Sequence, residues 1–130
     1  MTIGDLARAL SARGVPAELC GDGRVGFSSV STDSRTLSGG ALFVALSGER
    51  FDGHDYVARA RENGAAGALV ERRVEVDVPQ LIVTDSKRAF GIAAGTWRSR
   101  FSLPVIAVAG SNGKTTVTQM VAAILGAAYG

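Results

Sequence analysis

Hydrophobic positions along the chain follow helical spacing in some segments and form strand-like runs in others. Apolar residues between Ile3 and Leu10 recur every three or four positions, which predicts a helix. Asp5 follows Thr2 at the spacing of a capping box, so we expect the helix to begin there. Later helices are predicted over residues 55–63, 85–101 and from 114 onward. Strands are predicted over residues 24–31, 41–46, 66–70, 79–84 and 105–109.

Strands and helices alternate from residue 41 onward, an order typical of βαβ units with mostly parallel pairing. A parallel strand and its apolar helix need neighbours on both faces, but the chain stops at Gly130 after one such unit. We therefore expect a fragment. Residues 1–84 would form a small mixed α/β domain, residues 85–102 a connecting helix, and residues 103–130 the truncated start of a second domain.

Composition narrows the class of protein. Of 130 residues, 46% are hydrophobic and 20% charged, which is typical of a globular chain rather than a disordered one. The net charge of +2 argues against a nucleic-acid arm or a membrane-surface helix, and we expect neither partner. One cysteine, Cys20, cannot form an intrachain disulfide, so the chain fits a reducing compartment.

A glycine-rich loop lies between the predicted strand at 105–109 and the last helix. Its residues are Gly110, Ser111, Asn112, Gly113, Lys114, Thr115 and Thr116. Glycines let backbone N–H groups approach an anion, Lys114 supplies a cation for the β- and γ-phosphates, and the Thr115 hydroxyl can ligate Mg²⁺. A strict Walker A motif would have glycine where Val108 stands, so this is a shortened variant. The alternative is a glycine turn before a capped helix.

The predicted fold class is therefore α/β. A small mixed α/β amino-terminal substrate domain would be followed by the first strand, phosphate loop and helix of a P-loop ATPase domain.

Two polar loops follow successive predicted strands, at residues 32–35 and 48–54. If these strands are neighbours, both loops would meet at one edge of the sheet, where ligands commonly bind. A hydroxyl there could bond to a base edge, arginines could bind phosphate and an aromatic ring could stack on a flat ligand. Residues of these kinds are Ser34, Arg35, Arg50 and Phe51. The alternative is an Asp33–Arg35 surface turn and a solvated loop, which spacing alone favours.

Two other features invite a functional interpretation but favour a structural one. His54 is the only histidine and precedes the predicted helix 55–63, in which Tyr56, Val57 and Ala60 would face inward. A lone histidine at such a position is more often structural than catalytic. Residues 21–26 match the dinucleotide pattern G-x-G-x-x-G, but no strand precedes them and no helix follows, which indicates a turn.

Two stretches resemble the bacterial Mur ligase family. VSTDSRTLSGGALFVALSGERFDGHDYVARARENGAAGALVE is similar to the amino-terminal domain of these enzymes, and VIAVAGSNGKTTVTQMVAAIL to their ATP-binding loop. Within the family, GERFDGHD, TWRSRF and GSNGKTTV most resemble the member that adds D-alanyl-D-alanine to UDP-MurNAc-tripeptide. The alternatives are the sibling that adds the third amino acid and a non-catalytic UDP-sugar-binding module.

The resemblance implies a cytoplasmic bacterial ligase of three domains that uses ATP and Mg²⁺. ATP would phosphorylate the terminal carboxylate of the tripeptide, and the dipeptide amine would attack the acyl phosphate. Residues Gly110 to Thr116 would lie at the ATP phosphates, with Lys114 as the catalytic residue at the γ-phosphate and Thr115 at magnesium. The implied UDP-sugar contacts are Thr32, Ser34, Arg35, Glu49, Arg50 and Phe51.

The family's acidic magnesium ligand, the rest of its central sheet and its carboxy-terminal domain have no counterpart in these residues. Phosphoryl transfer needs lysine, metal and nucleophile together, so we expect the 130 residues alone to be inactive.

Overall fold

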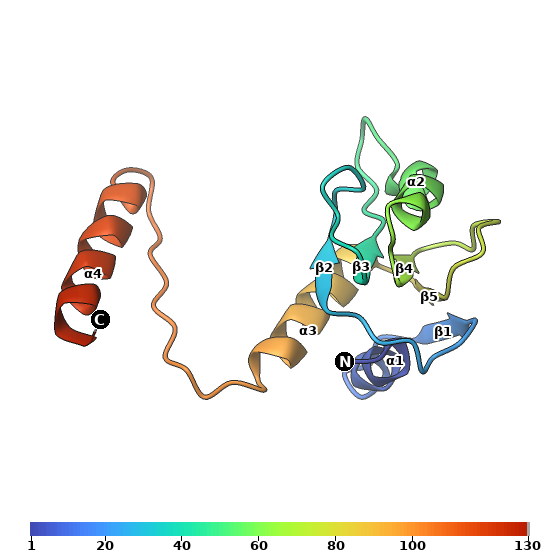
Figure 1. Ribbon diagram of the computed structural model, residues 1–130, viewed down its shortest axis with the longest axis horizontal. Coiled ribbons are helices and arrows are strands. Elements are labelled where there is room, and N and C mark those ends of the chain that lie inside the picture. The colour runs from blue at the N-terminus through green and yellow to red at the C-terminus, as the bar shows by residue number, and fades with distance from the viewer. Residues whose placement is uncertain (130) are drawn as a thin grey trace. The chain divides into compact units, whose positions relative to one another are not determined.

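The computed structural model describes residues 1–129 and divides them into two units, one spanning Met1–Arg100 and one beginning at Phe101. The first unit contains a five-stranded sheet flanked by helices (Figure 1). Its elements are α1 (Ile3–Ser11), β1 (Ala17–Cys20), β2 (Ser29–Ser31), β3 (Ala41–Val44), the 3-10 helix η1 (Gly53–Tyr56), α2 (Val57–Glu62), β4 (Gly67–Val70), β5 (Gln80–Val83) and α3 (Ser86–Arg98). The second unit contains α4 (Lys114–Tyr129).

The sheet has the order β1-β5-β4-β3-β2. Strands β3, β4 and β5 pair in parallel, as the alternation of strands and helices from residue 41 predicts, and β2 also pairs in parallel with β3. Strand β1 pairs antiparallel with β5 at one edge. The carboxyl ends of β2, β3 and β4 therefore lie at the same edge of the sheet, which is where ligands bind in open α/β sheets.

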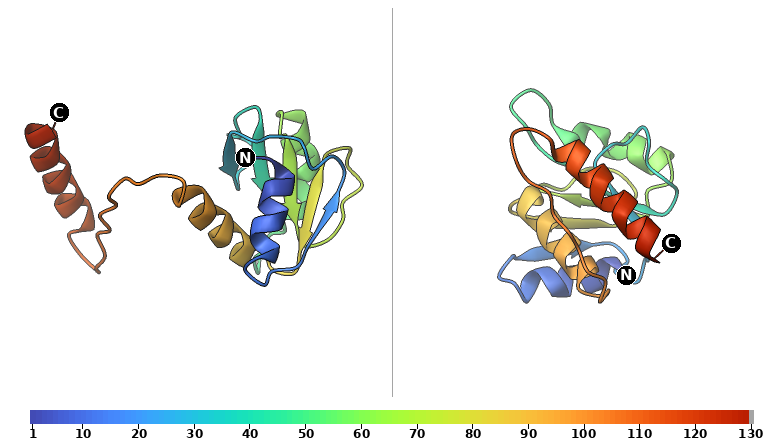
Figure 2. Two further views of the ribbon diagram at one scale, coloured as in Figure 1. Left: turned by 90° about the horizontal axis from the view of Figure 1, so that it is seen from below. Right: turned by 90° about the vertical axis from the view of Figure 1, so that its left-hand side faces the viewer.

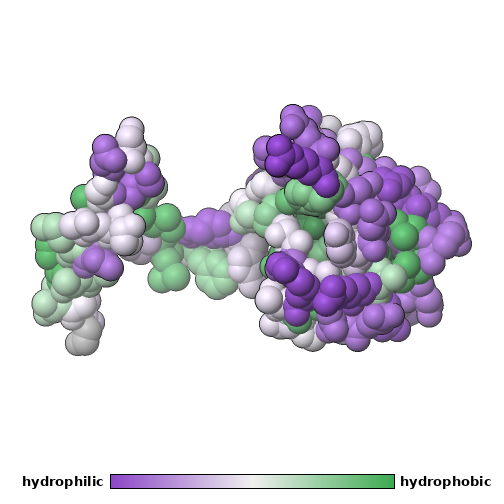
Figure 3. Space-filling view, turned by 90° about the horizontal axis from the view of Figure 1, so that it is seen from above, coloured by the Kyte–Doolittle hydropathy of each residue, from purple (hydrophilic) through white to green (hydrophobic). Residues whose placement is uncertain are grey.

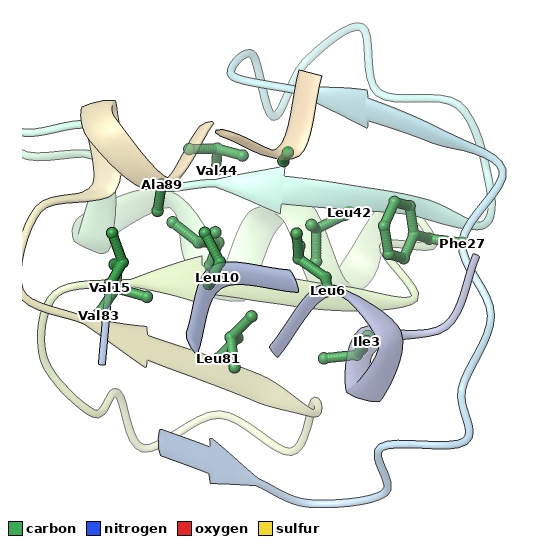
Figure 4. Close-up of a cluster of buried hydrophobic side chains, with 12 residues drawn as sticks. Ile3, Leu6, Leu10, Val15, Phe27, Leu42, Val44, Leu81, Val83 and Ala89 are labelled. Carbon is green, nitrogen blue, oxygen red and sulfur yellow. The ribbon is translucent and has the colours of Figure 1, made fainter. Parts of the chain in front are cut away.

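Both faces of the central strands are covered, so β3 and β4 are buried at every position. Successive side chains of β3 point to opposite faces: Leu42 and Val44 join the cluster under α1 and α3, while Phe43 joins the cluster under α2. Figure 2 (left) shows α1 in front of the sheet and α2 behind it. Figure 4 shows the first cluster, in which Leu6 and Leu10 of α1 lie over the strands.

The predicted capping box is confirmed at the start of α1. The Asp5 backbone N–H donates to Thr2 Oγ1 at 3.0 Å, and the Thr2 N–H donates to Asp5 Oδ2 at 2.9 Å. These bonds satisfy two backbone donors that a helix start would otherwise leave open. The Asp85 side chain caps α3 in a similar way by accepting from the Arg88 N–H at 2.8 Å. Ala89 and Ala93 of α3 are buried in the first unit's core, so this helix packs as part of that unit.

The sequence misplaces the edge strands. Strand β1 was not expected, and the strand predicted over 24–31 forms only at Ser29–Ser31. Both edge strands are short and carry exposed side chains, so their hydrophobic pattern is weak. Pairing with a neighbour, rather than local sequence, decides where they form.

In the second unit, α4 begins at Lys114 as predicted, but residues 105–109 are not a strand. Val105 and Ile106 are 68% and 61% exposed. A strand requires a hydrogen-bonded neighbour, and the described part of the second unit contains no other extended segment paired with this one. Among residues 1–129, no helix combines the length and hydrophobicity that a membrane span requires.

Leu81 and Leu19 face each other across β5 and β1, but Leu81 is fully buried and Leu19 is 38% exposed. Leu81→Ala should lower the free energy of unfolding by about 2–5 kcal/mol because it leaves a cavity in the core. Leu19→Ala, the matched control, should cost about 1 kcal/mol or less. Urea denaturation of both variants measures the difference, and equal losses would contradict the packing described for α1 over β5.

Candidate ligand pocket and phosphate loop

The loops that follow β2 and β3 meet at the carboxyl edge of the sheet and enclose a pocket of about 550 Å³. Its lining residues are Thr32, Asp33, Ser34, Arg35, Phe43, Leu46, Phe51, Gly53, Tyr56 and Arg59. These loops lie at the top of the first unit in Figure 1. Figure 3 shows this unit from above, with apolar residues among hydrophilic ones on its surface. The structure thus brings together Thr32, Ser34, Arg35 and Phe51 of the expected contacts. Glu49 and Arg50 belong to the same loop but do not line the pocket.

Asp33 and Arg35 form an ion pair with two side-chain hydrogen bonds within the first loop. The Arg35 side chain donates from Nε to Asp33 Oδ1 at 3.0 Å and from NH2 to Oδ2 at 2.7 Å, and its backbone N–H donates to Oδ1 at 2.9 Å. The Arg35 guanidinium, followed by this backbone bond, lowers the pKa of the Asp33 carboxyl to about 2. Much of the charge of Arg35 is therefore engaged inside the loop.

Tyr56 and Arg59 were not anticipated as pocket residues. The sequence predicts an α-helix from residue 55 with Tyr56 facing inward, but residues 53–56 form a 3-10 turn and Tyr56 is 45% exposed on the pocket wall. Arg59 follows one turn later on α2. Within residues 1–129 the Arg59 side chain makes no hydrogen bond or ion pair, unlike Arg35. The spacing of an aromatic residue and an arginine three positions apart, just after the loop, was the available signal.

The second loop folds back on itself. Gly48 N–H donates to the Phe51 carbonyl at 2.9 Å, and Gly53 N–H donates to the Leu46 carbonyl at 2.8 Å. A side chain at Gly53 would come within 2.6 Å of the Leu46 backbone, so only glycine fits there. In this loop the Phe51 ring lines the pocket and is 59% exposed.

His54 lies buried beside the pocket rather than in it. Its Nε2 accepts from the Glu71 backbone N–H at 2.8 Å, and its Nδ1 contacts Asp52 Oδ1. The His54 backbone N–H, the His54 ring and Arg72 all donate to Asp52, which holds the pKa of that carboxyl well below its usual range.

The predicted phosphate loop, residues 110–116, lies in the second unit. Gly110 and Gly113 have φ angles of 150° and 76°, in the region that favours glycine, and α4 begins directly afterwards. Lys114 Nζ donates to the Gly110 carbonyl, which holds the ammonium group over the loop. Glycines, a helix start and a lysine are the parts of a phosphate-binding loop. Thr115 supplies a hydroxyl, while residues 1–129 contain no cluster of three or more acidic, histidine or cysteine side chains that could hold a metal.

A family profile described as "Mur ligase family, catalytic domain" matches residues 26–95, more than half of the chain and including both pocket loops. The chain belongs to the Mur ligase family. It is 51% identical over 96 residues to the UDP-N-acetylmuramoyl-tripeptide–D-alanyl-D-alanine ligase of Escherichia coli. The matched region covers 74% of this chain and 21% of that enzyme. Mur ligases that add 2,6-diaminopimelate also match, at lower identity than this E. coli enzyme. The chain spans about a fifth of the length of these curated relatives.

Solved Mur ligases have the same fold. MurF from Acinetobacter baumannii matches with a TM-score of 0.81 and 36% identity over 96% of this chain and 27% of that one. MurF from Thermotoga maritima, solved in complex with ADP, matches with a TM-score of 0.64 and 33% identity over 78% of this chain and 23% of that one. The predicted mixed α/β fold and the predicted family are therefore confirmed.

The Asp33–Arg35 pair gives a test by pH. The folded-state pKa of Asp33, about 2, lies below its ordinary value, so the stability it contributes is complete above about pH 4 and is lost as pH falls toward 2. Arg35→Ala should raise the pKa of Asp33 toward about 3.9, measured by ¹³C NMR of its carboxyl carbon. Arg24→Ala, which breaks the similar exposed Asp22–Arg24 pair, should leave Asp33 unchanged. An Asp33 pKa that does not move in Arg35→Ala would contradict the assigned cause.

Proposed function

We propose that this chain is the amino-terminal part of an ATP-dependent ligase that joins D-alanyl-D-alanine to UDP-MurNAc-tripeptide in peptidoglycan precursor synthesis. The single observation that carries the proposal is the pocket between the loops that follow β2 and β3, at the carboxyl edge of the sheet. This pocket lies in the stretch that is similar to ligases named for that substrate. We assign residues 1–84 to a UDP-sugar-binding domain, residues 85–102 to a connecting helix and residues 103–130 to the start of an ATP-binding domain.

The pocket would hold the UDP-sugar. Thr32 and Ser34 would bind the uridine part, and the exposed rings of Phe51 and Tyr56 would pack against flat or apolar parts of the ligand. Arg59 would bind the pyrophosphate, because its guanidinium is not committed to a carboxylate as that of Arg35 is. Glu49 and Arg50 would contact the ligand beyond the pocket.

The phosphate loop would bind ATP, and the ADP complex of a solved relative supports this. The backbone of Gly110 to Thr116 would surround the phosphates, while Lys114 would neutralise charge on the γ-phosphate during its transfer to the tripeptide carboxylate. The dipeptide amine then attacks the acyl phosphate, so an amide bond forms and inorganic phosphate leaves. Mg²⁺, when bound, would offset phosphate charge; Thr115 is the residue of this chain suited to ligate it.

We further propose that the reaction takes place in the bacterial cytoplasm, on small-molecule substrates and without a nucleic-acid or membrane partner. The 130 residues by themselves would not complete it. Phosphoryl transfer requires lysine, metal and nucleophile in one geometry, and the described residues offer no acidic cluster for the metal. Phosphate release by the purified chain that depends on ATP and D-alanyl-D-alanine would overturn this.

Arg59 provides the direct test of the pocket. Isothermal titration of the chain with UDP-MurNAc-tripeptide should show binding, and Arg59→Gln should weaken it by about 10-fold or more, because a charge-assisted phosphate contact is lost. Arg24→Gln removes another exposed arginine, one away from the pocket, and should leave the affinity unchanged. The proposal fails if the wild-type chain does not bind; unchanged affinity of Arg59→Gln would remove only the role of Arg59.

Lys114 provides the test of the second site. In a ligase that contains this chain together with the remaining domains, Lys114→Ala should reduce turnover by about 10³-fold or more while UDP-MurNAc-tripeptide binding stays intact. Steady-state phosphate release and titration with the UDP-sugar measure the two properties separately. Retained turnover would refute the role assigned to Lys114.

A further inference from the structure

His54 is the only histidine of the chain. Its side chain is 1% exposed and does not line the pocket. Its Nε2 accepts a hydrogen bond from the Glu71 N–H at 2.8 Å, and an accepting ring nitrogen carries no proton. The proton of the neutral ring is therefore on Nδ1, where it is donated to Asp52 Oδ1. Both ring nitrogens are used, and the two bonds fix one tautomer and one orientation of the ring.

These bonds join two separate parts of the fold. Asp52 belongs to the loop of residues 47–53, which carries Phe51 and Gly53 of the pocket, whereas Glu71 and Arg72 directly follow β4. Arg72 makes the second connection, from NH2 to Asp52 Oδ2 at 2.7 Å. Apart from these two connections to the end of β4, the loop is held mainly by the backbone bonds that close it on itself and on Leu46.

Glu71 is itself held in place. Its Oε1 accepts from the Ser86 backbone N–H at 2.8 Å and from Ser86 Oγ at 2.9 Å, at the start of α3. The backbone of Glu71 thus contacts the loop through His54, and its side chain contacts the first residue of α3. The acceptor ring of His54 is bonded to a backbone group with little freedom to move.

We propose that His54 is a positioning residue of the pocket. Its neutral ring connects the loop of residues 47–53 to the end of β4, and this connection holds Phe51 where the UDP-sugar binds. The identity of the ligand rests on the proposed function; the connection itself does not. The affinity of the pocket therefore depends on a side chain that never touches the ligand.

Three substitutions separate the two bonds from the space that the ring fills. His54→Asn places an amide where Nδ1 lies and keeps the bond to Asp52, while His54→Gln reaches the position of Nε2 and can accept from Glu71. His54→Phe fills the space and makes neither bond. Because the bond to Glu71 joins the loop to β4, the Gln variant should restore most of the function.

Titration of the 130-residue chain with UDP-MurNAc-tripeptide should give Kd values about tenfold weaker for His54→Phe and His54→Asn, and within about threefold of wild type for His54→Gln. Asp22→Asn, in a loop away from this pocket, is the control and should bind as wild type does. Wild-type affinity in His54→Phe would mean that the ring only fills space. Equal affinities of the Asn and Gln variants would mean that the bond to Glu71 does not contribute to binding. Either result overturns the proposal.

A measurement on the unmodified chain keeps the test independent of how the variants fold. Because the chain has one histidine, the ¹⁵N spectrum of its imidazole needs no assignment. At pH 8 we expect a protonated Nδ1 and an unprotonated Nε2; a protonated Nε2 overturns the proposal. Failure of the wild-type chain to bind UDP-MurNAc-tripeptide, together with the expected tautomer and slow amide exchange in residues 47–53, would refute the proposed ligand and leave the connection of the loop to β4 in place.

Discussion

The pocket depends on the parallel pairing of β2, β3 and β4. Because parallel strands end at the same edge of the sheet, the loop after β2, the loop after β3 and Glu71 after β4 come together there. The pocket is also continuous with the core, since Phe43 packs in the cluster under α2 and also lines the pocket. Packing of the sheet and the shape of the pocket are therefore one property of the first unit.

Electrostatics divide the arginines of this edge into two kinds. Asp33 and Asp52 each accept hydrogen bonds from an arginine and from a backbone N–H. These bonds lower the pKa of both carboxyl groups, and the arginines offset part of their negative charge. Arg35 and Arg72 are thus committed to holding loops in place. The Arg59 side chain on α2 makes no hydrogen bond or ion pair in the described chain, although its charge contributes to the lowered pKa of Asp33. Residue type alone does not distinguish these roles; the neighbouring carboxylates do.

Sequence alone predicted the elements whose signals are local. The capping box at Thr2, the apolar runs at β3 and β4, and the start of α4 at Lys114 each depend on residues close in the chain. It missed β1 and predicted a strand over 105–109 because edge and isolated strands depend on distant partners. It predicted that the two loops would meet only if their strands were neighbours, as β2 and β3 are, while spacing alone favoured a surface turn and a solvated loop. It misjudged Tyr56, because helical periodicity does not reveal that residues 53–56 turn more tightly than an α-helix and place the ring on the pocket wall.

The pocket and the phosphate loop also differ in what holds their shape. The pocket relies on contacts between residues far apart in the chain, such as the bond from the Asn63 amide to the Ser34 carbonyl at 2.7 Å and that from Glu71 to His54. The predicted phosphate loop, by contrast, has two glycines with positive φ angles and a helix that starts beside them. Its described shape thus depends on residues close together in the chain, whereas the pocket combines residues from several elements of the first unit. Substitutions in the core of the first unit should therefore change the pocket much more than they change residues 110–116.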